Sequence, residues 1–145
     1  MPGTTVLLVD DEEEHRARVR LILERQQCLV YEAASYSAAM SIFDTYADSV
    51  QLLITAIALP DGNGCSLAIA MREQKPGLRV LFVSFGVGIE AGKYHGLRVP
   101  SLYVLKKPFR ATELVRRVNK ILQTVDSLSF AGGLKTLTAG RSPEL

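Results

Sequence analysis

Side chains that could do chemistry follow the short apolar runs of this sequence. Asp10 and Asp11 follow TVLLV, Ser84 ends LRVLFVS, and Lys107 comes shortly after LYVL. Two carboxylates, a hydroxyl and an ammonium group are the groups that hold a hard cation and the oxygens of a phosphoryl group. Ala56 follows another such run, LLIT, and its methyl group supplies neither a nucleophile nor a metal ligand.

The apolar pattern predicts how these groups are brought together. Short apolar runs alternate with amphipathic stretches, which is typical of a parallel β-sheet covered by helices on both faces. In such an open α/β sheet, ligands gather at the carboxyl ends of the strands. Five strands are predicted, over residues 5–10, 29–33, 51–55, 78–84 and 102–105.

Helical spacing of apolar residues predicts the connections between these strands. Ser35 is a plausible N-cap of the second helix, and the third opens after Gly64. Segment 86–98 is rich in glycine and has a thin apolar stripe, so only a short or irregular fourth helix is expected there. The apolar stripes are Val19, Ile22 and Leu23; Ala39, Ile42, Phe43 and Tyr46; Leu67, Ala70 and Met71; and Leu114, Val115, Val118, Ile121 and Leu122.

Composition limits the classes of function. With 145 residues, 48% of them hydrophobic, the chain can bury the core of one domain. A net charge of +2 gives no electrostatic reason to expect a nucleic-acid or membrane partner. We interpret the arginines of the first helix as a solvated face. They are Arg16, Arg18, Arg20 and Arg25.

The two cysteines, Cys28 and Cys65, lack metal-binding spacing and are interpreted as reduced thiols. The first residues show no targeting signal, and no apolar window reaches membrane-spanning length. We therefore expect a cytoplasmic protein.

Four segments in this order carry a resemblance: VLLVDDE, LLITAIALPDGNG, VLFVS and KKPF. Together they resemble the receiver domains of two-component response regulators, over about residues 4–125. The resemblance implies a flavodoxin-like, doubly wound, five-stranded parallel sheet of order 2-1-3-4-5, and a cis bond between Lys107 and Pro108. We expect a receiver domain over 1–125 and a tail or linker over 126–145, where Ser, Thr and Gly increase.

The resemblance also implies roles for single residues. Asp11 would be a direct Mg²⁺ ligand, Asp10 would hold metal-bound water, and Ala58 would offer its backbone carbonyl. Ser84 would donate a hydrogen bond to a phosphoryl oxygen, and Lys107 would pair with the phosphoryl group or the acceptor carboxylate.

Two positions depart from the family pattern. The phosphoacceptor position falls on Ala56, and the aromatic switch position falls on Val104, with Tyr103 one place early. Because the pocket lacks one carboxylate, we expect no resident cofactor and only weak residual Mg²⁺ binding.

Other polar residues have simpler interpretations. Asp61 is read as a turn residue beside glycine, and strand alternation points Thr55 away from the side chain of residue 56. His15 and His95 are interpreted as surface residues. The aspartates after the first strand could also cap the first helix, with Lys107 left as a structural ion-pair partner.

Three classes of function remain open. We favour a non-enzymatic, phosphorylation-independent signalling module, a pseudo-receiver of a phosphorelay. It would contact a sensor kinase or output protein, or dimerise, through the predicted fourth helix, fifth strand and fifth helix. The second class is an ordinary phosphoacceptor regulator in which alanine has replaced an aspartate at position 56. The third is a small enzyme or nucleotide binder, which the short glycine patterns and the sequence VDDEEE do not favour.

Overall fold

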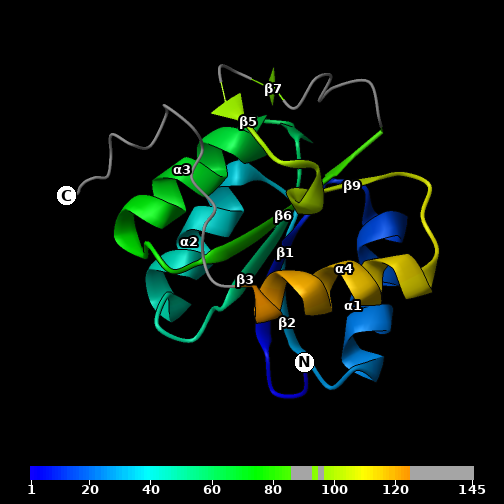
Figure 1. Ribbon diagram of the computed structural model, residues 1–145. Coiled ribbons are helices and arrows are strands. Elements are labelled where there is room, and N and C mark those ends of the chain that lie inside the picture. The colour runs from blue at the N-terminus through cyan, green and yellow to red at the C-terminus, as the bar shows by residue number, and fades with distance from the viewer. Residues whose placement is uncertain (86–92, 95–96, 125–145) are drawn as a thin grey trace.

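The computed structural model describes residues 1–85, 93–94 and 97–124. A five-stranded parallel sheet with the order β2-β1-β3-β6-β9 forms its centre, as the sequence predicts (Figure 1). The order places β1 and β3 in the interior, where every residue of both strands is buried. The strands are β1 (Thr5–Val9), β2 (Leu29–Ala33), β3 (Leu52–Ala56), β6 (Arg79–Ser84) and β9 (Val104–Lys106).

Within the described ranges, four α-helices cover the two faces of this sheet. Helix α1 contacts α4 on one face, and α2 contacts α3 on the other (Figure 1). In the described part of the chain, no helix is long and apolar enough to cross a membrane. The helices are α1 (Glu13–Arg25), α2 (Tyr36–Tyr46), α3 (Gly64–Gln74) and α4 (Ala111–Gln123).

Most members of the predicted apolar stripes are fully buried. Others, such as Ile22, Ile42 and Leu122, are partly buried, and Tyr46 is 40% exposed. Cys28 and Cys65 are buried free thiols, and burial raises the pKa of Cys65 to about 12. The fully buried stripe residues are Val19, Leu23, Ala39, Phe43, Leu67, Met71, Leu114, Val118 and Ile121.

The start of α2 is fixed by two side chains. The Ser35 hydroxyl accepts a hydrogen bond from the Ala38 N–H, which confirms the predicted N-cap. The Asp61 carboxylate also accepts from the N–H groups of Tyr36 and Ser37, at 2.7 and 3.0 Å. These hydrogen bonds lower the pKa of Asp61. The interpretation of Asp61 as only a turn residue was therefore incomplete, because it fastens the loop after β3 to a helix N-terminus.

The prediction for segment 86–98 was wrong where the structure describes it. Residues 93–94 and 97–98 form the short strands β7 (Lys93–Tyr94) and β8 (Leu97–Arg98), which pair antiparallel. Gly92 and Gly96 lower the helix propensity of this part of the sequence. The rest of this segment, His95 and the expected tail at 126–145 lie outside the described residues.

The predicted last strand also needs a correction. Residues Ser101–Tyr103 form a 3₁₀ turn, and β9 begins only at Val104, two residues later than expected.

A small antiparallel pair, β4 (Ala58–Leu59) and β5 (Gly62–Asn63), leads from β3 into α3. At its end the N–H of Gly64 donates to the Ile57 carbonyl at 2.7 Å. A Cβ atom on Gly64 would lie 2.2 Å from the backbone oxygen of Ala56. The close approach of these two backbone segments therefore requires glycine at position 64.

Replacing Gly64 should destabilise the fold. The added methyl group of Gly64→Ala meets rigid backbone, so we expect a loss of about 1–3 kcal/mol in the free energy of unfolding. Gly77→Ala is the matched control, because its Cβ would meet nothing within 4 Å and a change within about 0.5 kcal/mol is expected. Urea unfolding of the two variants measures the difference, and equal midpoints would contradict the prediction.

Candidate functional site

A cavity of about 400 Å³ opens at the carboxyl ends of β1, β3 and β6. The structure brings to it the side chains that the sequence singled out from separate strands, together with Glu12 and Phe85. The lining residues are Asp10, Asp11, Glu12, Ala56, Ile57, Ala58, Val83, Ser84, Phe85 and Lys107.

Ala56 is the last residue of β3, and it lines this cavity while only 8% exposed. Thr55 is fully buried, does not line the cavity, and donates its hydroxyl to the Ala56 carbonyl at 2.8 Å. The predicted orientation of Thr55, away from the side chain of residue 56, therefore agrees with the structure.

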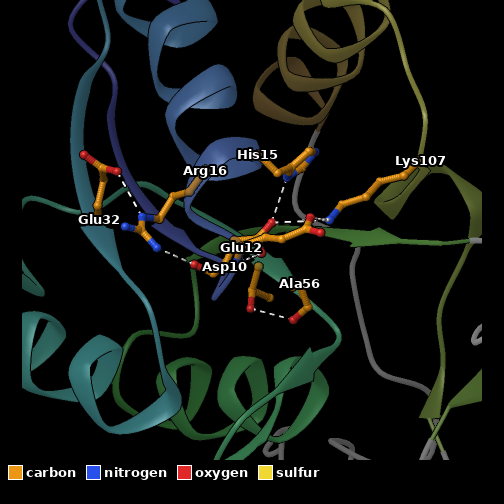
Figure 2. A network of polar contacts seen from close by, with 8 residues as sticks. Asp10, Glu12, His15, Arg16, Glu32, Ala56 and Lys107 are labelled. Atoms are coloured by element: carbon orange, nitrogen blue, oxygen red, sulfur yellow. Dashed lines mark hydrogen bonds and ion pairs between the residues drawn. The ribbon is translucent and has the colours of Figure 1, made fainter.

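Asp10 holds the central carboxylate of the site, and its side chain is 4% exposed. One oxygen, Oδ1, accepts a hydrogen bond from the N–H of Glu12 at 2.9 Å, at the start of α1. The other, Oδ2, lies 2.7 Å from Nδ1 of His15 (Figure 2). Because a carboxylate only accepts, Nδ1 carries the shared proton. Asp10 thus ties the end of β1 to the first turn of the next helix.

The interpretation of His15 as a surface residue was wrong. Its side chain is 14% exposed, and its ring packs edge-on against Phe109, with 5.6 Å between the ring centroids. The other ring nitrogen, Nε2, is buried without a hydrogen-bond partner among the described residues. The imidazole is therefore held between Asp10 and the segment that precedes α4.

Lys107 reaches the same carboxylate from the far side of the cavity. Its Nζ lies 3.4 Å from Oδ2 of Asp10, 3.3 Å from Oε1 of Glu12 and 4.7 Å from the centroid of the Phe85 ring. The peptide bond between Lys107 and Pro108 is cis, as the resemblance implies. The predicted ion pair with Asp10 is present, while Glu12 rather than the exposed Asp11 is the second partner.

Two arginines of α1 are not part of a solvated face. Arg16 donates from Nη1 to the backbone oxygen of Asp10 at 2.7 Å and from Nε to Glu32 at 3.0 Å (Figure 2). Arg20 donates to the other oxygen of Glu32 at 3.0 Å. Burial raises the pKa of Glu32, but these two guanidinium groups outweigh it and leave that pKa lowered.

A third arginine, Arg18, donates to the Phe109 carbonyl at 2.9 Å and lies over its ring, 5.4 Å from the centroid. Only Arg25 of the four is left as an exposed residue without such a role in the described contacts.

The charge of Asp10 is favoured in spite of its burial. Burial alone would raise the pKa of Asp10, because desolvation penalises the ionised form. The hydrogen bonds from His15 and the Glu12 N–H, and the charge of Lys107, act the other way and leave the pKa lowered. The site therefore holds a buried carboxylate in its ionised form.

The donor set does not fit a tight magnesium site as it stands. Mg²⁺ requires near-ideal octahedral oxygen coordination. Both oxygens of Asp10 are engaged, and Ala56 supplies none. Lys107 brings an ammonium group to the same oxygen that a cation would use. Asp11 and Ala58 are both exposed at the cavity.

Val104 faces a different part of the molecule. It is buried and lines a second groove, of about 690 Å³, between β9 and α4. The neighbouring Tyr103 is 5% exposed. Arg117 donates to the carbonyls of Ser101, Leu102 and Val104 along this groove.

Sequence reasoning missed three residues of the cavity network: Glu12, His15 and Phe85. The only signal for His15 was its place five residues after Asp10, within the first turn of a predicted helix. Nothing in the spacing indicated which way these side chains would turn.

The model of the response regulator receiver domain family matches residues 6–119. The chain belongs to this family. Receiver domains are signalling modules of two-component systems that interact with sensor kinases and output domains, and they are generally not enzymes.

Curated relatives are longer than this receiver domain. It is 29% identical over 124 residues to the sensor kinase CckA of Brucella abortus, covering 86% of this chain and 13% of the relative. It is 30% identical over 118 residues to the transcriptional regulatory protein CpxR of Escherichia coli K12, covering 81% of this chain and 49% of the relative. The chain thus spans half or less of the length of these relatives.

Solved receiver structures share the fold. A receiver protein from Sinorhizobium medicae has a TM-score of 0.72 at 25% identity, covering 83% of this chain and 94% of that one. The receiver domain of the hybrid histidine kinase CckA has a TM-score of 0.67 at 28% identity, covering 82% and 99%.

The lowered pKa of Asp10 makes the stability of this receiver domain depend on pH. The pKa of Asp10 is lower in the folded protein than in the unfolded chain, so its ionised carboxylate stabilises the fold fully at pH values above the pKa of the unfolded chain. This stabilisation is lost as the pH falls through the pKa of Asp10 in the folded protein. We expect the free energy of unfolding to decrease below about pH 5, and to decrease less in Asp10→Asn. At neutral pH, Asp10→Asn should cost about 1–3 kcal/mol.

Urea unfolding at several pH values, without divalent cations, measures this dependence. An Asp10→Asn variant with the same acid dependence as the natural protein would show that another group is responsible.

Proposed function

We propose that this receiver domain is a cytoplasmic pseudo-receiver, which signals through protein contacts without being phosphorylated. One observation carries the proposal. Ala56 is the last residue of the central strand β3. It lines the cavity with a methyl group at the position where the family resemblance places the phosphoacceptor carboxylate.

Phosphoryl transfer needs an oxygen nucleophile aligned with the phosphorus atom. Ala56 offers none. The Thr55 hydroxyl donates to the Ala56 carbonyl, and the Asp61 carboxylate accepts from two N–H groups at the N-terminus of α2. Asp10 is hydrogen-bonded through both oxygens. These contacts support the proposal, because none of these three side chains is free to replace the missing acceptor.

The remaining pocket residues are assigned structural roles in this proposal. Lys107 neutralises Asp10 and Glu12, which keeps a buried carboxylate compensated. Ser84 lines the cavity at the end of β6, and its carbonyl accepts the Lys107 N–H at 2.6 Å. Mg²⁺ binding at Asp10, Asp11 and the Ala58 carbonyl would be weak.

The second candidate is an ordinary phosphoacceptor domain in which alanine has replaced an aspartate at position 56. The other pocket residues favour this candidate, because Asp10, Asp11, Ser84 and Lys107 still surround one cavity. Under it, restoring the carboxylate would restore the chemistry.

Phosphorylation by a small-molecule donor tests the pseudo-receiver proposal, and Ala56→Asp tests whether restoring the carboxylate restores the chemistry. The natural protein and Ala56→Asp are incubated with acetyl phosphate and Mg²⁺, and phosphate incorporation is followed by intact mass. Ala56→Asn is the matched control, because it adds polar volume without a nucleophile. We expect no label on the natural protein or the asparagine variant.

Labelling of Ala56→Asp alone would show that position 56 is the acceptor position and that the natural alanine prevents phosphorylation. An acid-labile phosphate on the natural protein would overturn the pseudo-receiver proposal.

We also propose that partners dock at the groove between β9 and α4. The described lining of this groove carries Lys106, Arg116, Arg117 and Lys120 against a single acidic side chain, Glu113. A symmetric dimer would bring these like charges together, whereas an acidic partner would neutralise them. The charge therefore favours an acidic partner protein over the homodimer that the sequence left open.

This charge distribution predicts that the protein is monomeric at low salt. Light scattering after size exclusion measures the mass at several protein concentrations. A dimer would contradict the prediction. If the double substitution Arg116→Ala/Lys120→Ala then made the protein monomeric, the groove would be the dimer interface. Arg25 is an exposed arginine outside the groove, so Arg25→Ala controls for the removal of a positive charge elsewhere on the surface.

A further inference from the structure

The carboxylate of Asp10 is surrounded by donors from three directions. The Glu12 N–H binds Oδ1, while Nδ1 of His15 and Nζ of Lys107 both approach Oδ2, at 2.7 and 3.4 Å (Figure 2). In addition, Arg16 donates to the Asp10 backbone oxygen. Little acceptor capacity remains on this side chain for a metal ion.

The donors also occupy the space that a cation would need. The nearest ligand atoms of Asp10, Glu12 and His15 lie within 4.8 Å of one another, a spacing compatible with a single ion. Lys107 places its ammonium group 3.3 Å from Glu12 and 3.4 Å from Asp10, so that position already holds a positive charge. A divalent cation would have to displace it against like-charge repulsion.

We propose that His15 is a positioning residue that keeps divalent cations off Asp10, so that His15 and Lys107 together replace a metal ion in this cavity. The inference deepens the proposed function, and it rests on that proposal for treating the cavity as the cation-binding pocket of a receiver domain. It adds a second obstacle to magnesium binding, separate from the loss of an oxygen ligand at Ala56.

Of the two side chains that approach Oδ2 of Asp10, His15 is held in place more firmly than Lys107. Lys107 is only 9% exposed, but its ammonium group ends a long, flexible stem and is shared between Asp10 and Glu12, at 3.4 and 3.3 Å. The imidazole is 14% exposed, starts from helix α1 and packs against Phe109. Its hydrogen bond to Oδ2 is also the shorter contact, at 2.7 Å. A cation that uses Oδ2 must therefore break a hydrogen bond to a charged group.

The test measures Mg²⁺ affinity by calorimetry, at one pH and constant ionic strength, in a protein with the oxygen ligand restored. The proteins are Ala56→Asp, Ala56→Asp/His15→Met and Ala56→Asp/His15→Asn. Methionine fills the space beside Phe109 without a donor. The asparagine amide can place a donor near the position of Nδ1 and keep the hydrogen bond to Asp10.

We expect the methionine variant to bind Mg²⁺ about tenfold more tightly than Ala56→Asp, and the asparagine variant to bind within about twofold of it. Equal affinities for all three proteins would overturn the proposal. So would a gain in the asparagine variant as large as in the methionine variant, because the hydrogen bond would then be irrelevant.

A second measurement needs no substitution of His15. In Ala56→Asp, the ring nitrogen resonances of His15 report the protonated, hydrogen-bonded Nδ1. We expect Mg²⁺ to shift these resonances along the same binding curve as the calorimetric titration, because a cation that uses Oδ2 breaks the hydrogen bond from Nδ1. His15 resonances that stay unchanged at saturating Mg²⁺ would overturn the proposal.

These outcomes are distinct from failure of the proposed function. Phosphate on the natural protein would refute the pseudo-receiver assignment without changing the dependence of Mg²⁺ affinity on residue 15. An affinity independent of residue 15 would refute the inference while leaving the natural protein unphosphorylated.

Discussion

A buried carboxylate needs compensation, and the compensation of Asp10 organises this end of the molecule. An ionised group removed from water is costly unless charges and hydrogen bonds replace its hydration. Here the replacement comes from the start of α1 through Glu12 and His15, and from the segment before α4 through Lys107. The same carboxylate therefore holds β1, α1 and the β9–α4 connection in one arrangement.

The sheet architecture and the position of the cavity could both be predicted from the sequence. Parallel strands with uniformly apolar residues can only be buried on both faces, and their carboxyl ends must then meet at one edge. That geometry brought Asp10, Ser84 and Lys107 together without any knowledge of side-chain contacts. The helix predicted within 86–98 was wrong at residues 93–94 and 97–98, which pair as short strands, because its apolar stripe was thin and its glycines lower helix propensity.

The contacts around the cavity were less predictable. The directions of His15 and Glu12 depend on where α1 begins, and element boundaries are the least certain part of a sequence pattern. All four arginines of α1 were assigned to solvent because arginine usually lies there, but three of them have acceptors in the structure. Their actual acceptors, the Asp10 and Phe109 carbonyls and Glu32, come from other elements that only tertiary packing brings close.

The backbone at position 56 is fixed by contacts that do not involve its side chain. The Thr55 hydroxyl binds the Ala56 carbonyl, the Gly64 N–H binds the next one, and Gly64 fits against the backbone of Ala56. A change of residue 56 therefore leaves the geometry of the strand end in place. During evolution, a domain built this way can lose its reactive group in one step while the surface seen by its partners persists.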